Sequence, residues 1–370
     1  MGIFTKKEKT PAQTVVQDVL KAQKNETALI IANPETAAIA QEFFTAFLES
    51  GVKPVLAYQQ KKSSMDFAEE SVVGAIKAEP DMILSISANK LGKDKAAMEA
   101  AYKIVVDGQE QTFDNTFDYL LSGKKSIRAV WTPGLTEDMF NRTVNIDYKL
   151  LGERCKAICK KYEGAVSVHV TAEGGTDITV GVKGRKGLED NGDFSQPGSG
   201  GNVPAGEVFI SPVVGTCEGK IVFDGSMTFS SGDAMLETPI SVTVKDGFVK
   251  DVTGGAEAAR LLKDITVAEA ESLAMVAQKK FTPEQGEAYR RNARNIGELG
   301  IGLNPAASIT GNMLEDEKAF RTCHFAIGQN YDGDAPALIH FDGIVRNPTI
   351  EVTYEDGSKF VLLERGELKI

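Results

Sequence analysis

Hydrophobic and polar positions follow one pattern in the first part of the chain. Four short apolar runs predict buried strands, at residues 28–33, 54–58, 82–86 and 127–131. The stretches between them, such as residues 95–106, have the spacing of helices. Because this alternation is typical of a mostly parallel sheet covered by helices, we expect an α/β domain over residues 1–150.

The best-marked helix follows the first apolar run. Asn33 suits an N-cap, Pro34 suits the first helical position and Glu35 places an acid in the first turn. The helix is expected to end at Ser50 and Gly51. The turn before it contains no glycine, so the fingerprint of a dinucleotide-binding fold is absent.

The pattern changes at about residue 165. Short alternating strands follow one another there, and Gly174–Gly175 and Asp246–Gly247 mark turns between them. Two helical stretches interrupt the strands, at residues 256–262 and 267–279. We therefore expect an α+β, mainly antiparallel domain over residues 151–370. Within it, residues 195–206 are expected to form a long flexible loop.

Composition narrows the class of protein. The 370 residues are 42% apolar and 25% charged, as in globular proteins, and no apolar run approaches the length of a membrane span. The net charge of -11 is spread along the chain without a basic cluster, so neither nucleic acid nor a membrane is an expected partner. The start lacks the apolar segment of a signal peptide, and the four cysteines form no CxxC pair. We expect a cytoplasmic protein with reduced thiols.

Histidine is rare in the chain but concentrated near its end. Of three histidines, His169 alternates within a strand and is expected to be structural, whereas His324 and His340 lie within 21 residues. Asp342 shares a strand face with His340, because residues i and i+2 point the same way. The zinc-protease motifs HExxH and HxxEH and the serine-hydrolase motif GxSxG are absent. Taken alone, this HxD pattern leaves both a metal site and hydrogen-bonded core polarity open.

The flanking sequence adds a family resemblance. Four segments carry it: NVPAGEVFISP, ARNIGELGIGLNP, RTCHFAIGQNY and IHFDGIVRNP. Together they resemble the thermophilic metalloprotease family typified by aminopeptidases T and S, from about residue 155 to the end of the chain; before residue 150 the likeness is only architectural. The resemblance implies a hydrolase, a metallo-aminopeptidase acting on peptides and forming a homodimer. It implies six metal-binding residues: Glu207, Glu298, His324, Tyr331, His340 and Asp342.

The chemistry of this set is coherent. Three carboxylates and two imidazoles suit zinc, cobalt, manganese or magnesium. Two divalent ions would balance the carboxylates and leave room for one hydroxide, so we expect a binuclear site. Asp342 is the expected bridging ligand. Glu298 and Tyr331 are the expected catalytic residues, Glu298 handling the proton of the attacking water and Tyr331 binding metal or the intermediate.

Two other readings stay open. The GIGLNP and IHFDGIVRNP segments are also similar to the 2,5-dihydroxypyridine dioxygenases, which hold one Fe(II) with two histidines and an aspartate. In that branch a histidine stands at the position of Glu298, and the counterparts of Glu207 and His324 are not ligands. His324, His340 and Asp342 would here form the iron triad of a ring-cleaving enzyme. The remaining reading is a protein that binds a metal or metabolite without turnover. Hydrolysis is the leading expectation.

Overall fold

The computed structural model describes residues 8–63, 66–87, 91–106 and 108–370 and divides into two compact units. The N-terminal unit comprises Met1–Gly152 and Gly192–Ala205, and the C-terminal unit comprises Glu153–Asn191 and Gly206–Ile370. The expected domain limits stay a prediction, because compactness does not show that either unit folds by itself. Among the described residues, every helix is too short or too polar to cross a membrane.

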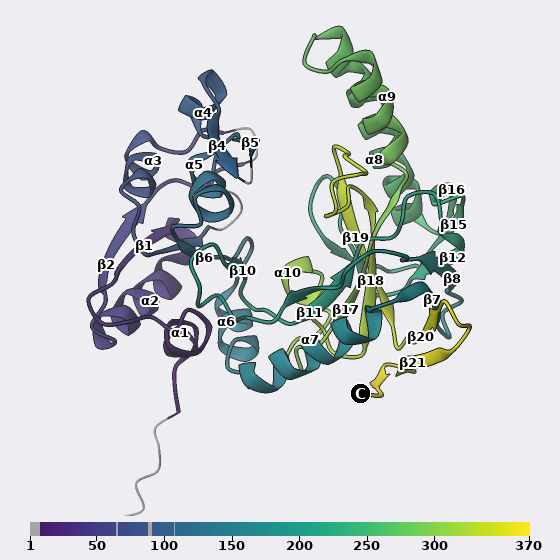
Figure 1. Cartoon of the computed structure of the whole chain (residues 1–370), viewed down its shortest axis with the longest axis horizontal. Helices are drawn as coiled ribbons and strands as arrows, with labels where there is room; N and C mark the ends of the chain where they lie inside the picture. Colours follow the sequence, from purple (N-terminus) through teal and green to yellow (C-terminus); the bar gives the residue numbers. More distant parts are fainter. Residues whose placement is uncertain (1–7, 64–65, 88–90, 107) are drawn as a thin grey trace, which may run out of the picture. The chain divides into compact units, whose positions relative to one another are not determined.

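A five-stranded parallel sheet forms the centre of the N-terminal unit (Figure 1). Its strands in spatial order are β10 (Gly200–Asn202), β6 (Arg128–Trp131), β3 (Met82–Ile86), β1 (Thr27–Ala32) and β2 (Lys53–Tyr58). Four of these strands match the predicted apolar runs, so the expected parallel sheet is confirmed. The fifth, β10, comes from the glycine-rich stretch that was expected to be a flexible loop; this expectation is wrong, because the stretch pairs with the exposed edge of β6.

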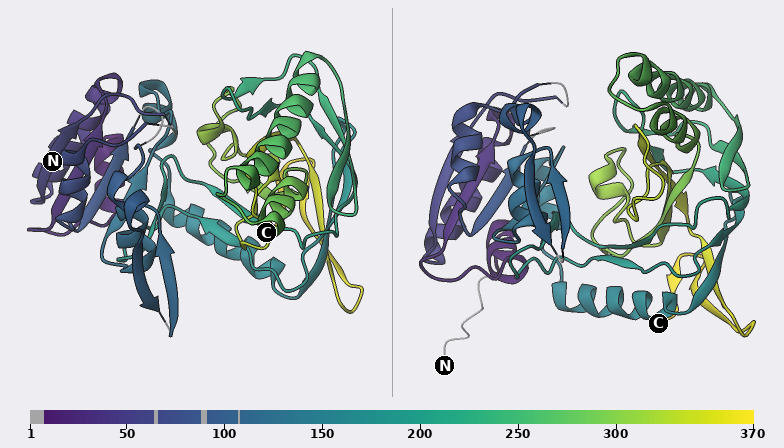
Figure 2. Two further views of the ribbon diagram at one scale, coloured as in Figure 1. Left: turned by 90° about the horizontal axis from the view of Figure 1, so that it is seen from above. Right: turned by 45° about the horizontal axis from the view of Figure 1, so that its top comes forward.

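Helices cover both faces of this sheet (Figure 2). After a 3-10 turn at Pro34–Thr36, helix α2 (Ala37–Glu49) buries Phe43 and Phe47, and Phe43 meets Phe140 of α6 (Glu137–Thr143) at 5.4 Å between ring centroids. On the other face, α3 (Glu70–Lys77) and the π-helical turn η3 (Tyr119–Gly123) pack on β1 and β3. The other short helices of the unit are α1 (Pro11–Thr14), η1 (Val15–Val19) and α5 (Thr116–Asp118).

The helix expected at residues 95–106 is wrong in its second half. Helix α4 ends at Glu99 (Lys95–Glu99), and β4 (Tyr102–Val106) then pairs with β5 (Gln109–Phe113) in an antiparallel hairpin. Tyr, Ile and Val are strong strand formers, so this hairpin follows local preference rather than the helical spacing.

Two antiparallel sheets form the C-terminal unit, and the protein as a whole is therefore mixed α/β. The larger sheet contains β16 (Phe248–Thr253), β15 (Ile240–Lys245), β12 (Glu218–Phe223), β8 (Asp177–Gly181), β7 (Ala165–Thr171), β20 (Thr349–Tyr354), β21 (Lys359–Glu364) and β22 (Glu367–Leu368). The second contains β14 (Ala234–Met235), β13 (Ser226–Met227), β19 (His340–Arg346), β18 (Thr322–Gly328), β17 (Ile296–Gly302), β11 (Glu207–Ile210) and β9 (Leu188–Asp190). The predicted turns at Gly175 and Gly247 are confirmed, with φ of +106° and +79°.

The two sheets touch through β12 and β19. A methyl group added to Gly343 would lie 2.4 Å from the Phe223 ring, so Gly343 faces the larger sheet. His340 and Asp342, which alternate with Gly343 along the strand, point to the other face. The two helical stretches expected near residue 265 form one continuous helix, α8 (Ala256–Ala277), against which α9 (Pro283–Asn292) packs (Figure 1). The other helices are α7 (Tyr148–Tyr162) and α10 (Met313–Asp316).

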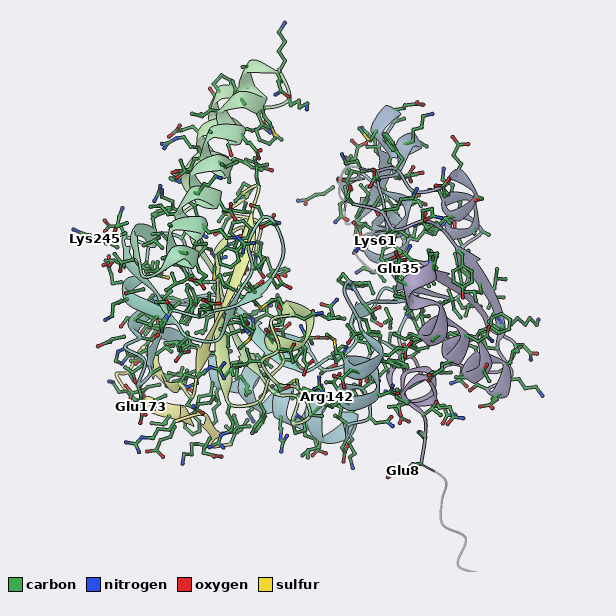
Figure 3. The ribbon with its side chains drawn as sticks, turned by 180° about the vertical axis from the view of Figure 1, so that it is seen from behind. Glu8, Glu35, Lys61, Arg142, Glu173 and Lys245 are labelled. Carbon is green, nitrogen blue, oxygen red and sulfur yellow. The ribbon has the colours of Figure 1, made fainter. Side chains whose placement is uncertain are left out.

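Charged side chains cover the surface of each unit (Figure 3). Glu35 and Lys61 are exposed on the N-terminal unit, and Glu173 and Lys245 on the C-terminal unit. All four cysteines are free thiols, as expected. His169 is partly exposed and lies 2.8 Å from Asp177 on the neighbouring strand, which is a structural role.

Candidate metal centre

Four neighbouring strands of the smaller C-terminal sheet carry the predicted ligands. Glu207 begins β11, Glu298 lies in β17 and His324 in β18, while His340 and Asp342 lie in β19. The register places these side chains in rows: Glu298 and Asp342 flank Ala326, and His324 lies opposite Gly300. Residues more than a hundred positions apart in the sequence therefore meet on one face of the sheet.

Small residues between the ligands make room for them. A methyl group added to Gly300 would lie 2.0 Å from Nε2 of His324, so the imidazole covers the bare backbone of the neighbouring strand. Ala326 separates Glu298 from Asp342 in the same way. The result is that His324 is fully buried and Glu298 almost so. Gly300, the second glycine of the GELGIG segment, is therefore the residue in the sequence that could have indicated a bulky side chain packed on this strand.

The side chains converge into three overlapping groups that can hold an ion. The groups are Glu207–Glu298–His324, Glu298–His340–Asp342 and Glu317–His324–Asp342, and within each group one donor atom per residue lies within 4.8 Å of the others. Nε2 of His324 lies 3.0 Å from Oε1 of Glu298 and 3.3 Å from Oε2 of Glu207. Nε2 of His340 lies 3.4 Å from Oε2 of Glu298 and 3.4 Å from Oδ1 of Asp342.

The imidazole of His340 is oriented with Nε2 toward two carboxylates. Its Nδ1 lies 2.8 Å from the backbone oxygen of Gln329, which can only accept a hydrogen bond. Nδ1 therefore carries the donated proton, and in the neutral ring the lone pair is on Nε2, the atom that faces Glu298 and Asp342. A backbone carbonyl on the outer nitrogen is a common support for a metal-binding histidine, because it fixes the tautomer and the ring orientation.

Several buried oxygen atoms in this cluster lack a hydrogen bond. Within the described chain, these are Oε2 of Glu207, Oε2 of Glu298 and Oδ1 of Asp342. Buried carboxylate oxygens without a donor are costly unless a cation binds them. Oxygen donors with one or two imidazoles suit a hard or borderline divalent ion, so the residues fit a metal.

Burial and charge shift the pKa values of this cluster in opposite directions. Burial alone would lower the pKa of His324, but hydrogen bonding to Glu298 and the charge of Glu207 outweigh it and raise the pKa to about 9. Burial alone would raise the pKa of Glu298, yet its contacts with His324 and His340 lower it to about 2. Glu298 is therefore an anion at neutral pH.

A buried lysine, which no pattern in the sequence predicted, completes the cluster. Lys318 is fully buried, its Nζ lies 2.7 Å from Oε1 of Glu207 and 3.7 Å from Asp190, and it also pairs with Glu317. Burial alone would lower the pKa of Lys318, but these carboxylates raise it well above its usual value. Lys318 and Glu317 follow α10 in the run EDEK, which has the composition of an exposed charged turn.

Two further carboxyl groups next to Lys318, those of Asp190 and Glu317, have a raised pKa. Burial raises the pKa of Asp190 to about 7, although Lys318 opposes it, and burial likewise raises the pKa of Glu317 to about 8. The surplus negative charge of the cluster is therefore reduced by bound protons as well as by the lysine.

Tyr331 lies at the border of the cluster. Its ring packs edge-on against His340, with 5.4 Å between centroids, and also contacts Phe209 at 4.9 Å, but the residue is 59% exposed. The structure thus brings Glu207, Glu298, His324, His340 and Asp342 together and places Tyr331 beside them. Their roles as ligands stay a prediction.

Comparison with known proteins decides the family. A family model described as 2,5-dihydroxypyridine 5,6-dioxygenase matches residues 19–368. The chain belongs to this family. A comparison with curated proteins finds no match.

Two solved structures share the fold over nearly the whole chain. The 2,5-dihydroxypyridine dioxygenase of Pseudomonas putida KT2440 is 15% identical, with 97% of this chain and 96% of that chain covered and a TM-score of 0.67. AmpT of Thermus thermophilus is 16% identical, with 97% and 98% covered and a TM-score of 0.65. The expected likeness to the aminopeptidase T fold is confirmed, but a fold common to both proteins does not separate their activities.

The predicted activity is wrong. A family of dioxygenases, matched from residue 19 to residue 368, replaces the expected metallo-aminopeptidase and with it the hydrolase and protease assignments. The cause of the error is physical. Carboxylates and imidazoles suit a metal ion whichever reaction the ion serves, so the local motifs indicate a candidate metal site and not the reaction.

Proposed function

We propose that this protein is a metal-dependent dioxygenase that opens the ring of a hydroxylated pyridine or a closely related aromatic compound. The family match over residues 19–368 supports the reaction class. The buried cluster around Glu298, His340 and Asp342 supports the need for a metal, since its oxygen atoms lack other donors.

Glu298, His340 and Asp342 are the residues that would hold the ion. His340 presents Nε2 because Gln329 fixes its other nitrogen, and the two carboxylates each present an oxygen atom without a hydrogen bond. A bound Fe(II) would offer coordination positions for dioxygen and the substrate and would relay electrons from the substrate, which is the net reductant, to dioxygen. This set has one histidine, so it differs from the expected triad of His324, His340 and Asp342, whose donors do not form one of the three groups found among the described residues.

The carboxylate of Glu298 has a chemical consequence. The resemblance to the dioxygenases implies a histidine at this position, whereas Glu298 adds a negative charge beside the ion. A more anionic ligand set stabilises the higher oxidation state of a metal and weakens its Lewis acidity. We therefore expect the iron-loaded enzyme to oxidise more readily in air than one with two histidine ligands.

His324 and Tyr331 have roles in handling the substrate. His324 lies between Glu298 and Glu207 and holds a proton in the metal-free protein, so it is placed to exchange a proton with a substrate hydroxyl group. Tyr331 is largely exposed beside His340, so the exposed part of its ring offers a surface against which a planar substrate can pack.

A single ion suits this cluster better than the expected pair. Glu207 binds the ammonium group of Lys318, and a second dication held by Glu207 would lie next to that fixed positive charge. Lys318 thus takes the place of a second metal in balancing the excess carboxylates. The expected homodimer stays a prediction for which this chain offers no further argument.

The deciding experiment measures oxygen consumption by protein purified without oxygen and loaded with Fe(II). With 2,5-dihydroxypyridine or related hydroxypyridines, we expect oxygen uptake matched by loss of ring absorbance, and one ion per chain. His340→Ala should lose both metal and activity. His169→Ala, which alters the partly exposed histidine of β7, should keep both. Iron-loaded protein that takes up no oxygen with any hydroxylated heteroaromatic compound would refute the proposal.

A further inference from the structure

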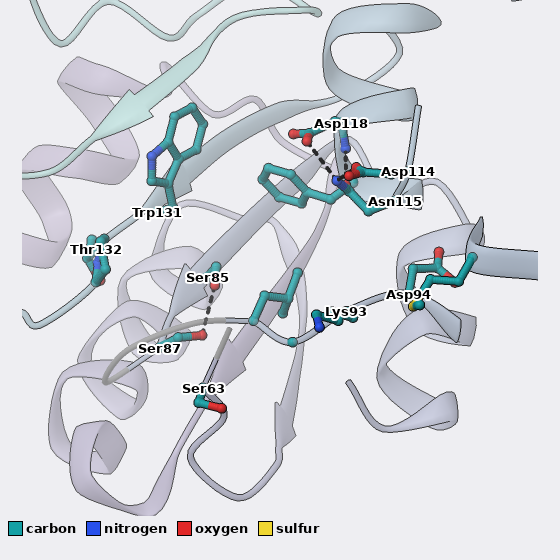
Figure 4. A pocket seen from close by; sticks show the side chains of 15 residues that line it. Ser63, Ser85, Ser87, Lys93, Asp94, Asp114, Asn115, Asp118, Trp131 and Thr132 are labelled. Carbon is teal, nitrogen blue, oxygen red and sulfur yellow. Dashed lines mark hydrogen bonds between the residues drawn. The ribbon is translucent and has the colours of Figure 1, made fainter. Parts of the chain in front are cut away.

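The N-terminal unit contains a cavity that the metal cluster does not explain. Its volume is about 770 Å³, within the range of cavities that enclose small organic ligands. It opens where β3 and β6 end, so that Ser85, Ser87, Trp131 and Thr132 line it (Figure 4). Ligands of parallel sheets bind outside the carboxyl ends of the strands, which is where this cavity lies.

One wall of the cavity is apolar and aromatic. Trp131 is half-buried at the end of β6, and Phe117 meets it edge-on with 6.1 Å between ring centroids and 84° between ring planes. Leu91 and Pro133 extend the same lining. In a T-shaped contact at least one face of the indole ring stays free of Phe117, and a flat ring is the shape that packs best on such a face.

The polar groups of the cavity include an unused hydrogen-bond donor. Ser85 and Ser87 are both buried, and their hydroxyl oxygens lie 2.9 Å apart. Only one of the two protons is used in that bond, and within the described residues neither hydroxyl has another partner. The second proton is therefore available to an acceptor atom of a ligand in the cavity.

The charge of the lining argues against an anionic ligand. Among the described residues, Asp94, Asp114 and Asp118 line the cavity together with Lys93. The Asp94 carboxylate is saturated by the backbone of Ala96, Ala97 and Thr116 and by the Tyr102 hydroxyl. Asp114 and Asp118 both accept from Asn115. The charge of these described side chains is negative on balance, so they would repel a phosphate or carboxylate.

We propose that this cavity is a second ligand site, which binds an uncharged planar aromatic molecule stacked on Trp131 with an acceptor atom bonded to the Ser85–Ser87 pair. The metal cluster contributes nothing to it, because every lining residue belongs to the N-terminal unit. The binding is therefore the same in metal-free and metal-loaded protein, and it is separable from the proposed dioxygenase reaction.

Trp131 provides the measurement, because it is the single tryptophan of the chain. Fluorescence of the full-length protein is titrated with two uncharged aromatic probes, adenosine and benzamide, and with their anionic counterparts, AMP and benzoate. We expect a saturable change with at least one uncharged probe and weaker binding of its anionic counterpart. Metal removal should leave the affinity unchanged.

A pair of variants tests the serine contact. Ser85→Ala should weaken binding about twofold to tenfold, the value of one net hydrogen bond, without lowering the melting temperature. Ser126→Ala is the matched control, since the Ser126 hydroxyl oxygen is buried, has no hydrogen-bond partner among the described residues and does not line the cavity. No saturable change with either uncharged probe, equal affinity for the anions, or equal loss in both variants would overturn the proposal.

Discussion

The cavity of the N-terminal unit and the candidate metal cluster of the C-terminal unit bury their polar groups in different ways. At the end of the parallel sheet, the Asp94 carboxylate is saturated by hydrogen bonds, and among the described residues one serine proton and the Thr132 hydroxyl are left without a partner. On the antiparallel sheet, carboxylates, imidazoles and a lysine share one buried cluster, and several of their oxygen atoms have no hydrogen bond. The first arrangement leaves only uncharged hydroxyl groups for a ligand, whereas the second leaves charged oxygen atoms that need a cation or extra protons.

Because of this difference, the two sites affect the free energy of unfolding differently. A cavity whose unpaired polar groups are a few uncharged hydroxyls costs less in the free protein than a cluster of unpaired buried charges. A buried cluster of like charges is held together by its counter-charges, so removing one of them exposes the full desolvation cost. Variants and metal removal should therefore affect the two regions to different degrees.

The largest expected effect on stability is that of Lys318→Met. Removing the ammonium leaves Glu207, Glu317 and Asp190 without their cation, which should destabilise the protein by about 3–5 kcal/mol in denaturant unfolding. Added divalent metal should restore part of the loss, with more than one ion bound per chain.

Lys359→Met is the control for that change. Its partner Glu351 lies in an exposed pair, for which about 0–1 kcal/mol is expected. If the two lysine variants have equal stability, Lys318 does not balance the cluster.

A smaller effect is expected from a matched pair of glycine substitutions. Gly300→Ala brings a methyl group onto His324, which should cost about 1–3 kcal/mol and weaken metal binding. Gly74→Ala lies in α3 with open space around it, so the better helix former should add about 0.5–1 kcal/mol. Thermal unfolding and metal titration measure both variants. Unchanged metal affinity in Gly300→Ala would mean that the position of His324 is not needed.

The smallest effect concerns pH and the metal. Burial alone would lower the pKa of His340, but Asp342 and Glu298 raise it well above the ordinary 6.5. At neutral pH an incoming ion must therefore displace a proton from Nε2, and metal affinity should rise about tenfold per pH unit above pH 7. Calorimetric titration in buffers of different ionisation enthalpy counts the released protons. An affinity that is already constant above pH 6.5 would show that His340 binds the metal without giving up a proton.

Local sequence determined much of this fold. The apolar runs of β1, β2, β3 and β6, the turn glycines Gly175 and Gly247, and the shared face of His340 and Asp342 were all predictable. Each depends on neighbouring residues, through strand alternation or a backbone conformation that glycine adopts at little cost. The chemistry of the donors also indicated a metal centre, although it left the reaction open.

Only the tertiary structure decided the rest. Lys318 contacts Glu207, which lies 111 positions away in the sequence. Strand β10 pairs with β6, which ends some 70 residues before β10 begins. No local pattern encodes such contacts, because they arise when distant strands pair in one register and bury what lies between them. The run that contains Lys318 looks like an exposed turn in the sequence, and the fold makes it the buried counter-charge of the metal centre.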